Sequence, residues 1–184
     1  MAKIVGVRTP LTKEAASVLR AGDVVSITGY IYTARDAAHK RLIGILEEGK
    51  GLPLDIRDQI IYYVGPAPAK PGYACGPAGP TTSYRMDPYT PTLLERGLRG
   101  MIGKGLRSKE VIASMKKNRA VYFAAVGGAA AVIARSIKES EVIAYEDLGP
   151  EAIRRFYVEG CPAIVAIDSR GFNLYESEPP KYAK

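Results

Sequence analysis

The chain has 184 residues, of which 47% are hydrophobic and 24% charged, and its formal net charge is +7. This length and composition are typical of one globular domain, so we expect a single domain over residues 1–184 with a polar tail from about residue 178. The sequence lacks both an apolar run of the roughly 18 residues that a membrane span needs and the apolar core of a secretory signal, which predicts a cytoplasmic protein without a membrane partner.

Basic residues are in excess, but their distribution does not favour nucleic acid. The densest group lies on and beside a predicted helix with Glu110 among the cations, which is typical of a solvated face. Neither interleaved aromatic residues nor zinc-ligand spacing accompanies it. A small dianionic ligand or an acidic partner subunit explains the charge at least as well. The group consists of Lys104, Arg107, Lys109, Lys116, Lys117 and Arg119.

The first part of the chain is rich in predicted strands and loops. Residues 24–32 are rich in Val, Ile, Thr and Tyr and predict a strand, and residues 34–48 place apolar side chains at helical spacing. Residues 65–80 form a loop rich in Gly and Pro, long enough that function is its usual explanation. The remaining predictions here are a strand at 59–64, a helix at 91–96 and a strand at 100–102.

In the second part of the chain, predicted strands alternate with helices. Ser108 is a suitable N-cap for a helix over 109–118. Strands that alternate with helices predict an α/β fold with parallel pairing in this part. The other predicted elements are a strand at 120–126, a helix at 129–137, a strand at 141–145, a short helix near 150–154, strands near 156–158 and 163–167, and a turn at 168–171.

The segment at residues 75–89 carries the strongest functional signal. Pro80 can precede or open a helix, whose first backbone N–H groups would have no partner inside the helix. Thr81 and Arg85 are four residues apart, so they would share one face of that helix. Free N–H donors, a hydroxyl and a guanidinium would then surround one point, which predicts a site for a carboxylate or a phosphate.

This segment also resembles a known family motif. Residues 79–87 read GPTTSYRMD and are similar to the GPTT-x-x-RMD motif of the class I, iron–sulfur-dependent fumarase and L-tartrate dehydratase family. The match is to the β subunit, which is equivalent to the C-terminal domain of the single-chain enzymes. The resemblance covers roughly residues 8–176 and includes, in the family's order, TARDAAHKR at 33–41, MIGKG at 101–105, YFAAVGGAA at 122–130 and AYEDLG at 144–149.

The resemblance implies both a fold and an activity. The fold would be a swivelling β/β/α-type domain with a mixed sheet. The activity would be that of the β subunit of a two-subunit [4Fe–4S] hydro-lyase, with fumarate hydratase as the first candidate and L(+)-tartrate dehydratase as the alternative. A non-catalytic module that binds anions or nucleic acid is the alternative from a different class.

Two arginines correspond to substrate residues of the family. Arg35 lies at a predicted strand-to-helix junction, and Arg85 lies in the GPTT motif. The planar guanidinium suits bidentate binding of a carboxylate, so the resemblance implies that both bind the substrate's carboxylates. For Arg35 the alternative is a surface arginine paired with Asp36 or Asp55.

Thr81 and Lys104 correspond to the groups nearest the chemistry. Thr81 matches the family threonine proposed to transfer the proton at carbon, which requires a cationic and dry setting because a hydroxyl is a weak acid. Lys104, between two glycines, would bind a substrate carboxylate or lower the cost of ionising Thr81. The alternatives are a helix N-cap for Thr81 and a turn lysine for Lys104.

Three further residues are candidates for supporting roles. His39, four residues after Arg35, could orient it or exchange protons with solvent, although a residue on the surface of the helix is the simpler expectation. Thr82 is the alternative to Thr81. Glu146 follows an apolar strand and could support the site or simply begin a turn.

The sequence predicts that this chain binds no metal by itself. A [4Fe–4S] cluster needs several thiolates, and only Cys75 and Cys161 are present, far apart in sequence, so we expect free thiols. The resemblance implies that the cluster belongs to an α subunit in an α2β2 heterotetramer. The expected partners are therefore that subunit and a dicarboxylate, without nucleic acid.

Overall fold

Seven strands form one mixed sheet in the computed structural model, which describes residues 4–125 and 130–182. The order across the sheet is β1-β2-β3-β4-β5-β7-β6, and β2 also pairs with β7, so β2, β3, β4, β5 and β7 form a closed circuit. Strands β1 to β5 pair in parallel, and β7 is antiparallel to β2, β5 and β6. The strands are β1 (Ile4–Arg8), β2 (Val24–Thr33), β3 (Ile60–Tyr62), β4 (Gly100–Gly103), β5 (Val121–Ala124), β6 (Ile137–Ala144) and β7 (Ile153–Ile167).

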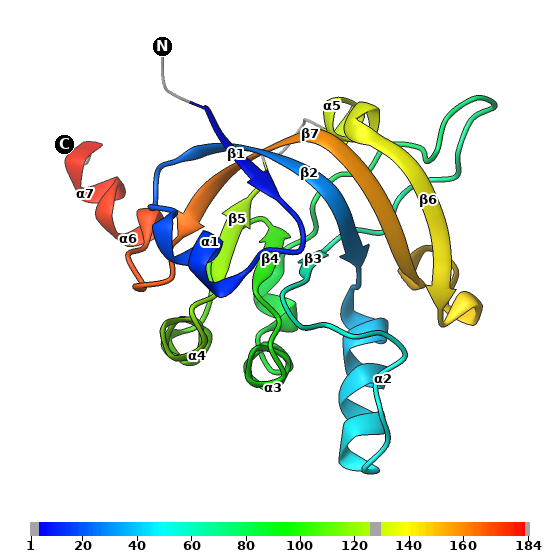
Figure 1. The fold of residues 1–184 in the computed structure, drawn as a ribbon, viewed down its shortest axis with the longest axis horizontal. Helices are drawn as coiled ribbons and strands as arrows, with labels where there is room; N and C mark the ends of the chain where they lie inside the picture. Colours follow the sequence, from blue (N-terminus) through cyan, green and yellow to red (C-terminus); the bar gives the residue numbers. More distant parts are fainter. Residues whose placement is uncertain (1–3, 126–129, 183–184) are drawn as a thin grey trace.

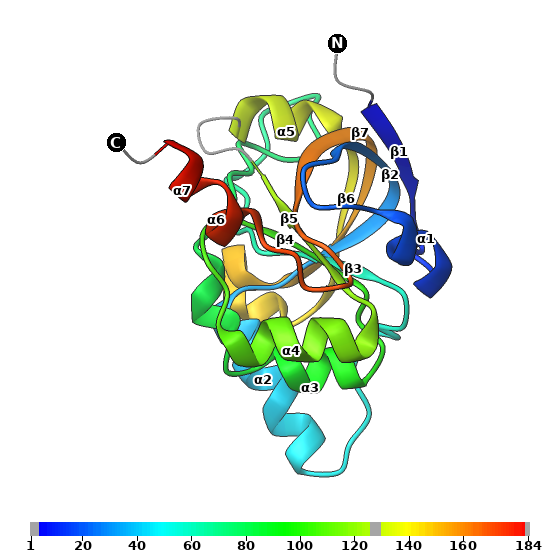
Figure 2. The ribbon, with the colours of Figure 1, turned by 90° about the vertical axis from the view of Figure 1, so that its left-hand side faces the viewer.

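The elements stack in three layers. The long strands β2, β6 and β7 arch over β3, β4 and β5, and helices α2 (Asp36–Glu47), α3 (Thr90–Glu95) and α4 (Lys109–Asn118) lie beneath them (Figure 1). Figure 2 shows α3 and α4 side by side under the sheet. The remaining helices are α1 (Lys13–Val18), η1 (Ser83–Met86), α5 (Ala130–Ser136), η2 (Glu146–Glu151), α6 (Leu174–Ser177) and α7 (Pro179–Tyr182).

Alternating side chains of the middle strands fill two separate cores. Ile27, Phe123 and Phe156 belong to the core between the strand layers, whereas Leu42 and Tyr122 belong to the core above the helices. Neighbouring residues of a strand point to opposite faces, so β5 contributes Phe123 to one core and Tyr122 to the other. The predicted mixed α/β domain is confirmed, and the swivelling domain stays a prediction. The parallel pairing predicted for the second part of the chain was wrong, because β7 is antiparallel to both β5 and β6.

Most predicted elements are present, but several boundaries were wrong. The two predicted strands near 156–158 and 163–167 are one strand, β7, which passes through Gly160 at a φ of 64°. The Gly160 N–H donates to Thr28 Oγ1 at 3.0 Å. The neighbouring strand β2 therefore holds the backbone of β7 at Gly160, between the two segments that we predicted as separate strands. The helix predicted near 150–154 is η2, which ends before Arg154 enters β7.

The ends of the chain also differ from the sequence prediction. Strand β1 and helix α1 were not predicted, and part of the expected polar tail is helical, as α7. The predicted end of the strand at 126 and start of the helix at 129 lie outside the described residues. In the described ranges no helix combines the length and the apolar character that crossing a bilayer requires.

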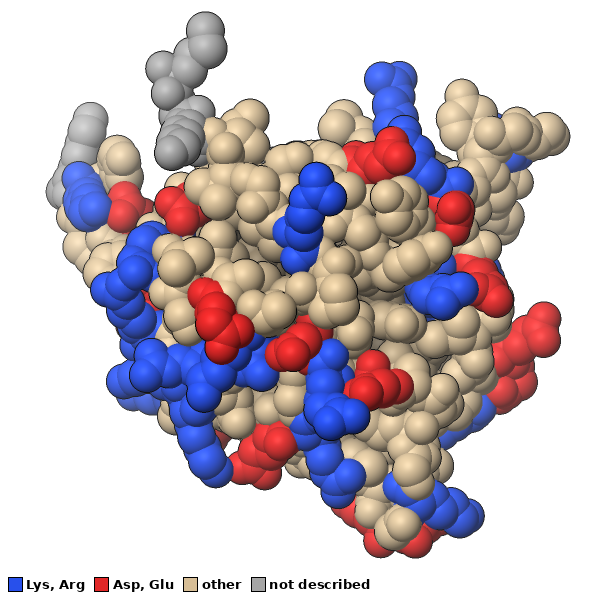
Figure 3. Space-filling model, in the orientation of Figure 1, with Lys and Arg blue, Asp and Glu red and all other residues tan. Residues whose placement is uncertain are grey.

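The basic group over α4 is only partly a solvated face. Figure 3 shows Lys and Arg gathered over α4 with Asp and Glu between them. Arg107, which we predicted to be part of this face, is buried instead: its Nε lies 2.7 Å from Asp87 Oδ1, and its Nη2 donates to Thr90 Oγ1 at 2.8 Å. Asp87 also accepts from the Ser108 N–H at 2.6 Å. The Arg107–Asp87 pair therefore ties η1 to the start of α4.

Candidate functional site

Thr81 and Lys104 lie on neighbouring stretches of backbone. The Thr81 N–H donates to Tyr63 O at 2.7 Å, and Thr81 O accepts from the Lys104 N–H at 3.3 Å. The Ser83 N–H then donates to Lys104 O at 2.9 Å, and Thr82 forms a parallel bridge with Lys104. This segment therefore runs as a short extension of the sheet beside the end of β4.

These backbone bonds correct the predicted helix start. The N–H groups of Thr81 and Ser83 are used by the sheet, so they are not free donors for an anion. The helix that follows, η1, is a 3-10 turn of four residues whose N-cap is Thr82, without a side-chain cap bond. Thr81 is therefore not a helix N-cap. The extension is possible because Gly103 has no Cβ, which would clash with Ser83 Oγ.

Arg85 nevertheless reaches Thr81 as the spacing predicted. A nitrogen of its guanidinium, Nη2, donates to Thr81 Oγ1. The 3-10 turn of η1 brings two residues four positions apart together even though Thr81 itself precedes the turn. The hydroxyl of Thr81 thus lies beside a permanent cation.

Arg35 joins this group through Asp36. Arg35 lies between β2 and α2, where the parallel strand β3 ends beside it. Its Nε lies 3.9 Å from Asp36 Oδ2, and the other carboxylate oxygen, Oδ1, lies 3.4 Å from Arg85 Nε. Arg35 Nη2 lies 3.5 Å from Glu151 Oε1. Gly65 leaves room for this arginine, since a Cβ there would lie 2.9 Å from Arg35 Nη1.

Three separate segments therefore converge at one surface. Arg35 and Asp36 come from the start of α2, Thr81 and Arg85 from the GPTT segment, and Lys104 from the end of β4. The side chain of Arg85 is 38% exposed and that of Arg35 is 25% exposed, so both can meet a ligand from outside. Lys104 is exposed and joins the cluster through its backbone. We call Arg35, Asp36, Thr81, Arg85 and Lys104 the arginine cluster.

Comparison with known proteins places the chain in a family. The family model described as Fumarase C-terminus matches residues 1–178. The chain belongs to this family. Among its relatives, "Fumarate hydratase class I, aerobic" of Escherichia coli K12 is 42% identical over 154 residues, which are 83% of this chain and 28% of that protein. "Fumarate hydratase 1, mitochondrial" of Leishmania major is 41% identical over the same share of each chain.

A third relative has nearly the same length as the matched region. "Putative L(+)-tartrate dehydratase subunit beta" of Methanocaldococcus jannaschii is 38% identical over 172 residues, which are 90% of this chain and 88% of that protein. The chain thus spans little more than a quarter of the fumarate hydratases above but almost all of this subunit.

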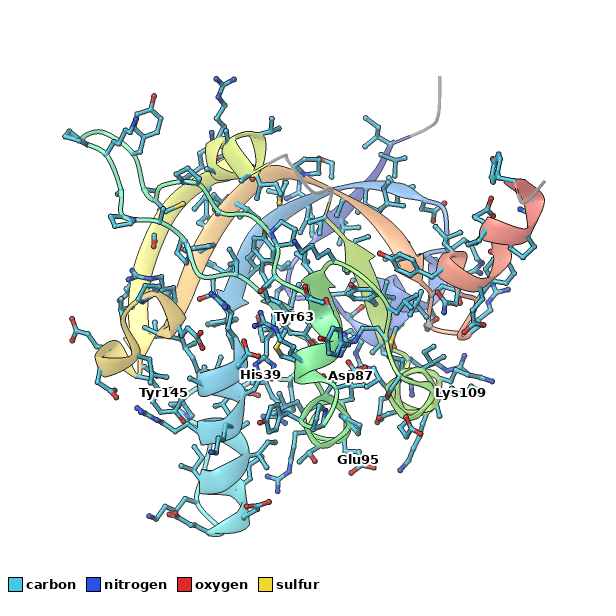
Figure 4. All side chains as sticks on the ribbon, turned by 180° about the vertical axis from the view of Figure 1, so that it is seen from behind. His39, Tyr63, Asp87, Glu95, Lys109 and Tyr145 are labelled. Atoms are coloured by element: carbon cyan, nitrogen blue, oxygen red, sulfur yellow. The ribbon has the colours of Figure 1, made fainter. Side chains whose placement is uncertain are left out.

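His39 of this Fumarase C-terminus domain is buried, which overturns the expected position on the helix surface. Its Nδ1 lies 2.9 Å from Arg35 O, and its ring packs edge-on against Tyr63 at 5.3 Å between centroids (Figure 4). Burial lowers the pKa of His39 to about 4, so the ring is neutral near pH 7. It contacts the backbone of Arg35 rather than its guanidinium, which favours support of the start of α2 over proton exchange with solvent.

Burial of a neutral His39 predicts a stability loss in mild acid. The unfolded chain takes up a proton near the ordinary pKa of about 6.5, whereas folded His39 resists protonation down to a pKa of about 4. The free energy of unfolding should therefore fall by about 2 kcal/mol from this residue between about pH 7 and pH 5. Denaturant titrations of wild type and His39→Gln at both pH values measure the difference. Equal losses in the two proteins would contradict a buried neutral histidine.

The other supporting candidates lie differently. Thr82 pairs with Lys104 through the backbone, and Glu146 is exposed at the start of η2, as expected of a residue that begins a turn. The acid of η2 that reaches the cluster is Glu151, which also accepts from the Ala37 N–H at 3.0 Å. Glu151 could not be predicted from neighbouring residues in the sequence, because it reaches α2 only through the path of the chain between β6 and β7.

The arginine cluster lies on an open surface. Five hollows on the described part of the molecule are lined by other residues. The hollow of about 600 Å³ beside the cluster is lined by Tyr84 and Leu106, the first adjacent to Arg85 and the second two residues after Lys104. Both side chains are exposed, at 62% and 59%.

The two cysteines are free thiols in the core, as predicted. Burial raises the pKa of both Cys75 and Cys161, which favours the protonated thiol over the thiolate that binds metals. Both belong to the core between the strand layers, as expected of packing residues.

Proposed function

We propose that this chain is the β subunit of a two-subunit hydro-lyase that adds water to, or removes water from, a four-carbon dicarboxylate. The reaction that we propose as its activity is the hydration of fumarate to (S)-malate. The observation that carries the proposal is the arginine cluster: the guanidinium groups of Arg35 and Arg85 share the Asp36 carboxylate, and Arg85 also contacts the Thr81 hydroxyl, on a Fumarase C-terminus domain. The relatives named as fumarate hydratases support the same reaction class.

The cluster suits a dianionic substrate. Arg35 and Arg85 each offer a planar fork of N–H donors, which matches the two oxygens of a carboxylate. Both guanidinium groups are partly exposed. The backbone of Lys104 lies beside Thr81, and the exposed Lys104 forms no ion pair with the described acidic residues. In the proposal Arg35 and Arg85 bind the two carboxylates, and Lys104 strengthens the hold on one of them.

Thr81 is the proposed proton-transfer group. Hydration places a hydroxyl on one carbon and a proton on its neighbour, and the reverse reaction removes that proton. A threonine hydroxyl is too weak an acid to ionise alone near neutral pH, and a hydrogen bond from a cation stabilises its ionised form. The Arg85 Nη2–Thr81 Oγ1 bond supplies such a cation, and the backbone bonds of Thr81 hold its position.

The family resemblance also implies a [4Fe–4S] cluster, and the donors in the described part of this chain do not fit one. A cluster needs several thiolates, whereas the chain has two cysteines, both buried and with raised pKa values. We therefore place the cluster on an α subunit, within an α2β2 heterotetramer in the cytoplasm. The relative named as a subunit beta, which this chain matches over 88% of its length, supports a separate chain.

L(+)-tartrate dehydration is the second candidate, because the relative that matches this chain in length is named for it. Both substrates present two carboxylates at similar spacing, so the arginine cluster serves either one. The test is a substrate panel on the complex, purified without oxygen after co-expression with an iron–sulfur partner. We expect rapid turnover of fumarate and (S)-malate and slow turnover of L-tartrate. The opposite order would assign the tartrate reaction, and activity on neither would refute the proposal.

A further inference from the structure

The carboxylate of Asp36 stands between the two arginines. Its Oδ1 lies 3.4 Å from Arg85 Nε, and its Oδ2 lies 3.9 Å from Arg35 Nε. Asp36 Oδ2 and Arg35 Nε are both buried and form no hydrogen bond with the described residues. These two atoms therefore interact electrostatically without a hydrogen bond, and neither is accessible to solvent.

Asp36 differs from the other groups that hold the arginines. Arg35 is also held by Glu151, and Arg85 is also held by Thr81, but each of these contacts one arginine. Among the ion pairs of residues 4–125 and 130–182, Asp36 is the carboxylate shared by both. A loss of Asp36 would therefore uncouple the two guanidinium groups.

The position of Asp36 at the start of a helix holds its backbone in place. It is the first residue of α2, a helix of 12 residues, and a carboxylate is stabilised at the N-terminus of a helix. Arginine side chains have many rotamers and lose their fixed geometry when they are not anchored. In both pairs the closest approach of Asp36 is to Nε of the arginine.

We propose that Asp36 is a positioning residue, which fixes the spacing of the Arg35 and Arg85 guanidinium groups and thereby makes the site select dicarboxylates by length. The inference rests on the proposed function, because it assumes that the two arginines bind the two ends of one substrate. A residue needed only for folding would change stability and affinity without changing the preference between ligands of different length.

The test compares two inhibitors on the intact complex with the α subunit. Succinate has the four-carbon length of the proposed substrates, and glutarate is one carbon longer. Wild type is expected to bind succinate more tightly than glutarate. In Asp36→Asn the ratio of the two inhibition constants should fall by about fivefold, which corresponds to roughly 1 kcal/mol. Asp36→Ser, which also lacks the charge but suits a helix start, serves if the Asn variant does not assemble.

A matched control is Asp147→Asn. Asp147 also joins α2 to η2, through a two-bond pair with Arg41 at 2.8 Å, and its ion pair involves neither Arg35 nor Arg85. This variant should keep the wild-type ratio. An unchanged ratio in both Asp36 variants, or an equal weakening of the two inhibitors, would overturn the positioning role while leaving the proposed function intact. A wild-type complex that neither turns over nor binds a dicarboxylate would overturn both.

Discussion

Replacement of Thr81 by Val is expected to lower kcat of the partner-bound enzyme by about 10²–10⁴-fold, the range for loss of a general acid–base group. Val keeps the size and branching of Thr but has no hydroxyl. KM should change by less than about threefold, because the hydroxyl is needed mainly in the transition state. Steady-state kinetics with fumarate and with (S)-malate measure both constants.

Thr82→Val is the control for this experiment. Thr82 is the adjacent threonine and bonds through its backbone beside Lys104, whereas the hydroxyl that Arg85 contacts belongs to Thr81. The Thr82 variant should keep kcat within about threefold of wild type. A large loss in Thr82→Val together with normal turnover in Thr81→Val would move the proton-transfer role to Thr82. Normal turnover in both would remove the role from this segment.

Replacement of Arg85 by Lys is expected to raise KM for a dicarboxylate by about 10–100-fold, although the charge is kept. The lysine ammonium cannot offer two parallel N–H donors to a carboxylate, and hydrogen bonds to charged groups contribute about 1.5–3 kcal/mol each. The value of kcat should fall as well, because Arg85 also holds Thr81 Oγ1. This double effect separates Arg85 from a residue that only binds substrate.

Arg41→Lys is the matched control for that change. Arg41 of α2 forms a two-bond pair with Asp147 of η2 and is not in the arginine cluster. Its replacement by Lys also removes a guanidinium with two parallel N–H donors, but from an exposed ion pair, and exposed ion pairs contribute little to stability. Both kinetic constants should stay near wild type. Equal KM values for wild type and Arg85→Lys would exclude Arg85 from carboxylate binding.

Local features of the sequence were predicted well. Ser108 caps α4 as expected, with its Oγ accepting from the Val111 N–H at 3.3 Å. The spacing of Thr81 and Arg85 predicted their contact. These features depend on residues within one turn of each other, and sequence patterns report such neighbours directly.

Features that depend on distant segments could not be predicted. The N–H groups expected to be free after Pro80 are not free, because the Thr81 N–H donates to Tyr63 O and the Ser83 N–H donates to Lys104 O, both on other segments. Arg107 and His39 appeared to be surface residues, but partners from other elements bury them. Asp36 was considered only as a partner that would make Arg35 structural, whereas it contacts Arg85 as well.

The most direct test of the account is a reconstitution measured without oxygen. The rate of fumarate hydration is determined for this chain alone, for the iron–sulfur α subunit alone and for the mixture. We expect turnover in the mixture only, because in the proposed function this chain supplies the arginine cluster and the α subunit supplies the metal centre. Appreciable turnover by this chain alone, or full activity of the α subunit without it, would contradict the account.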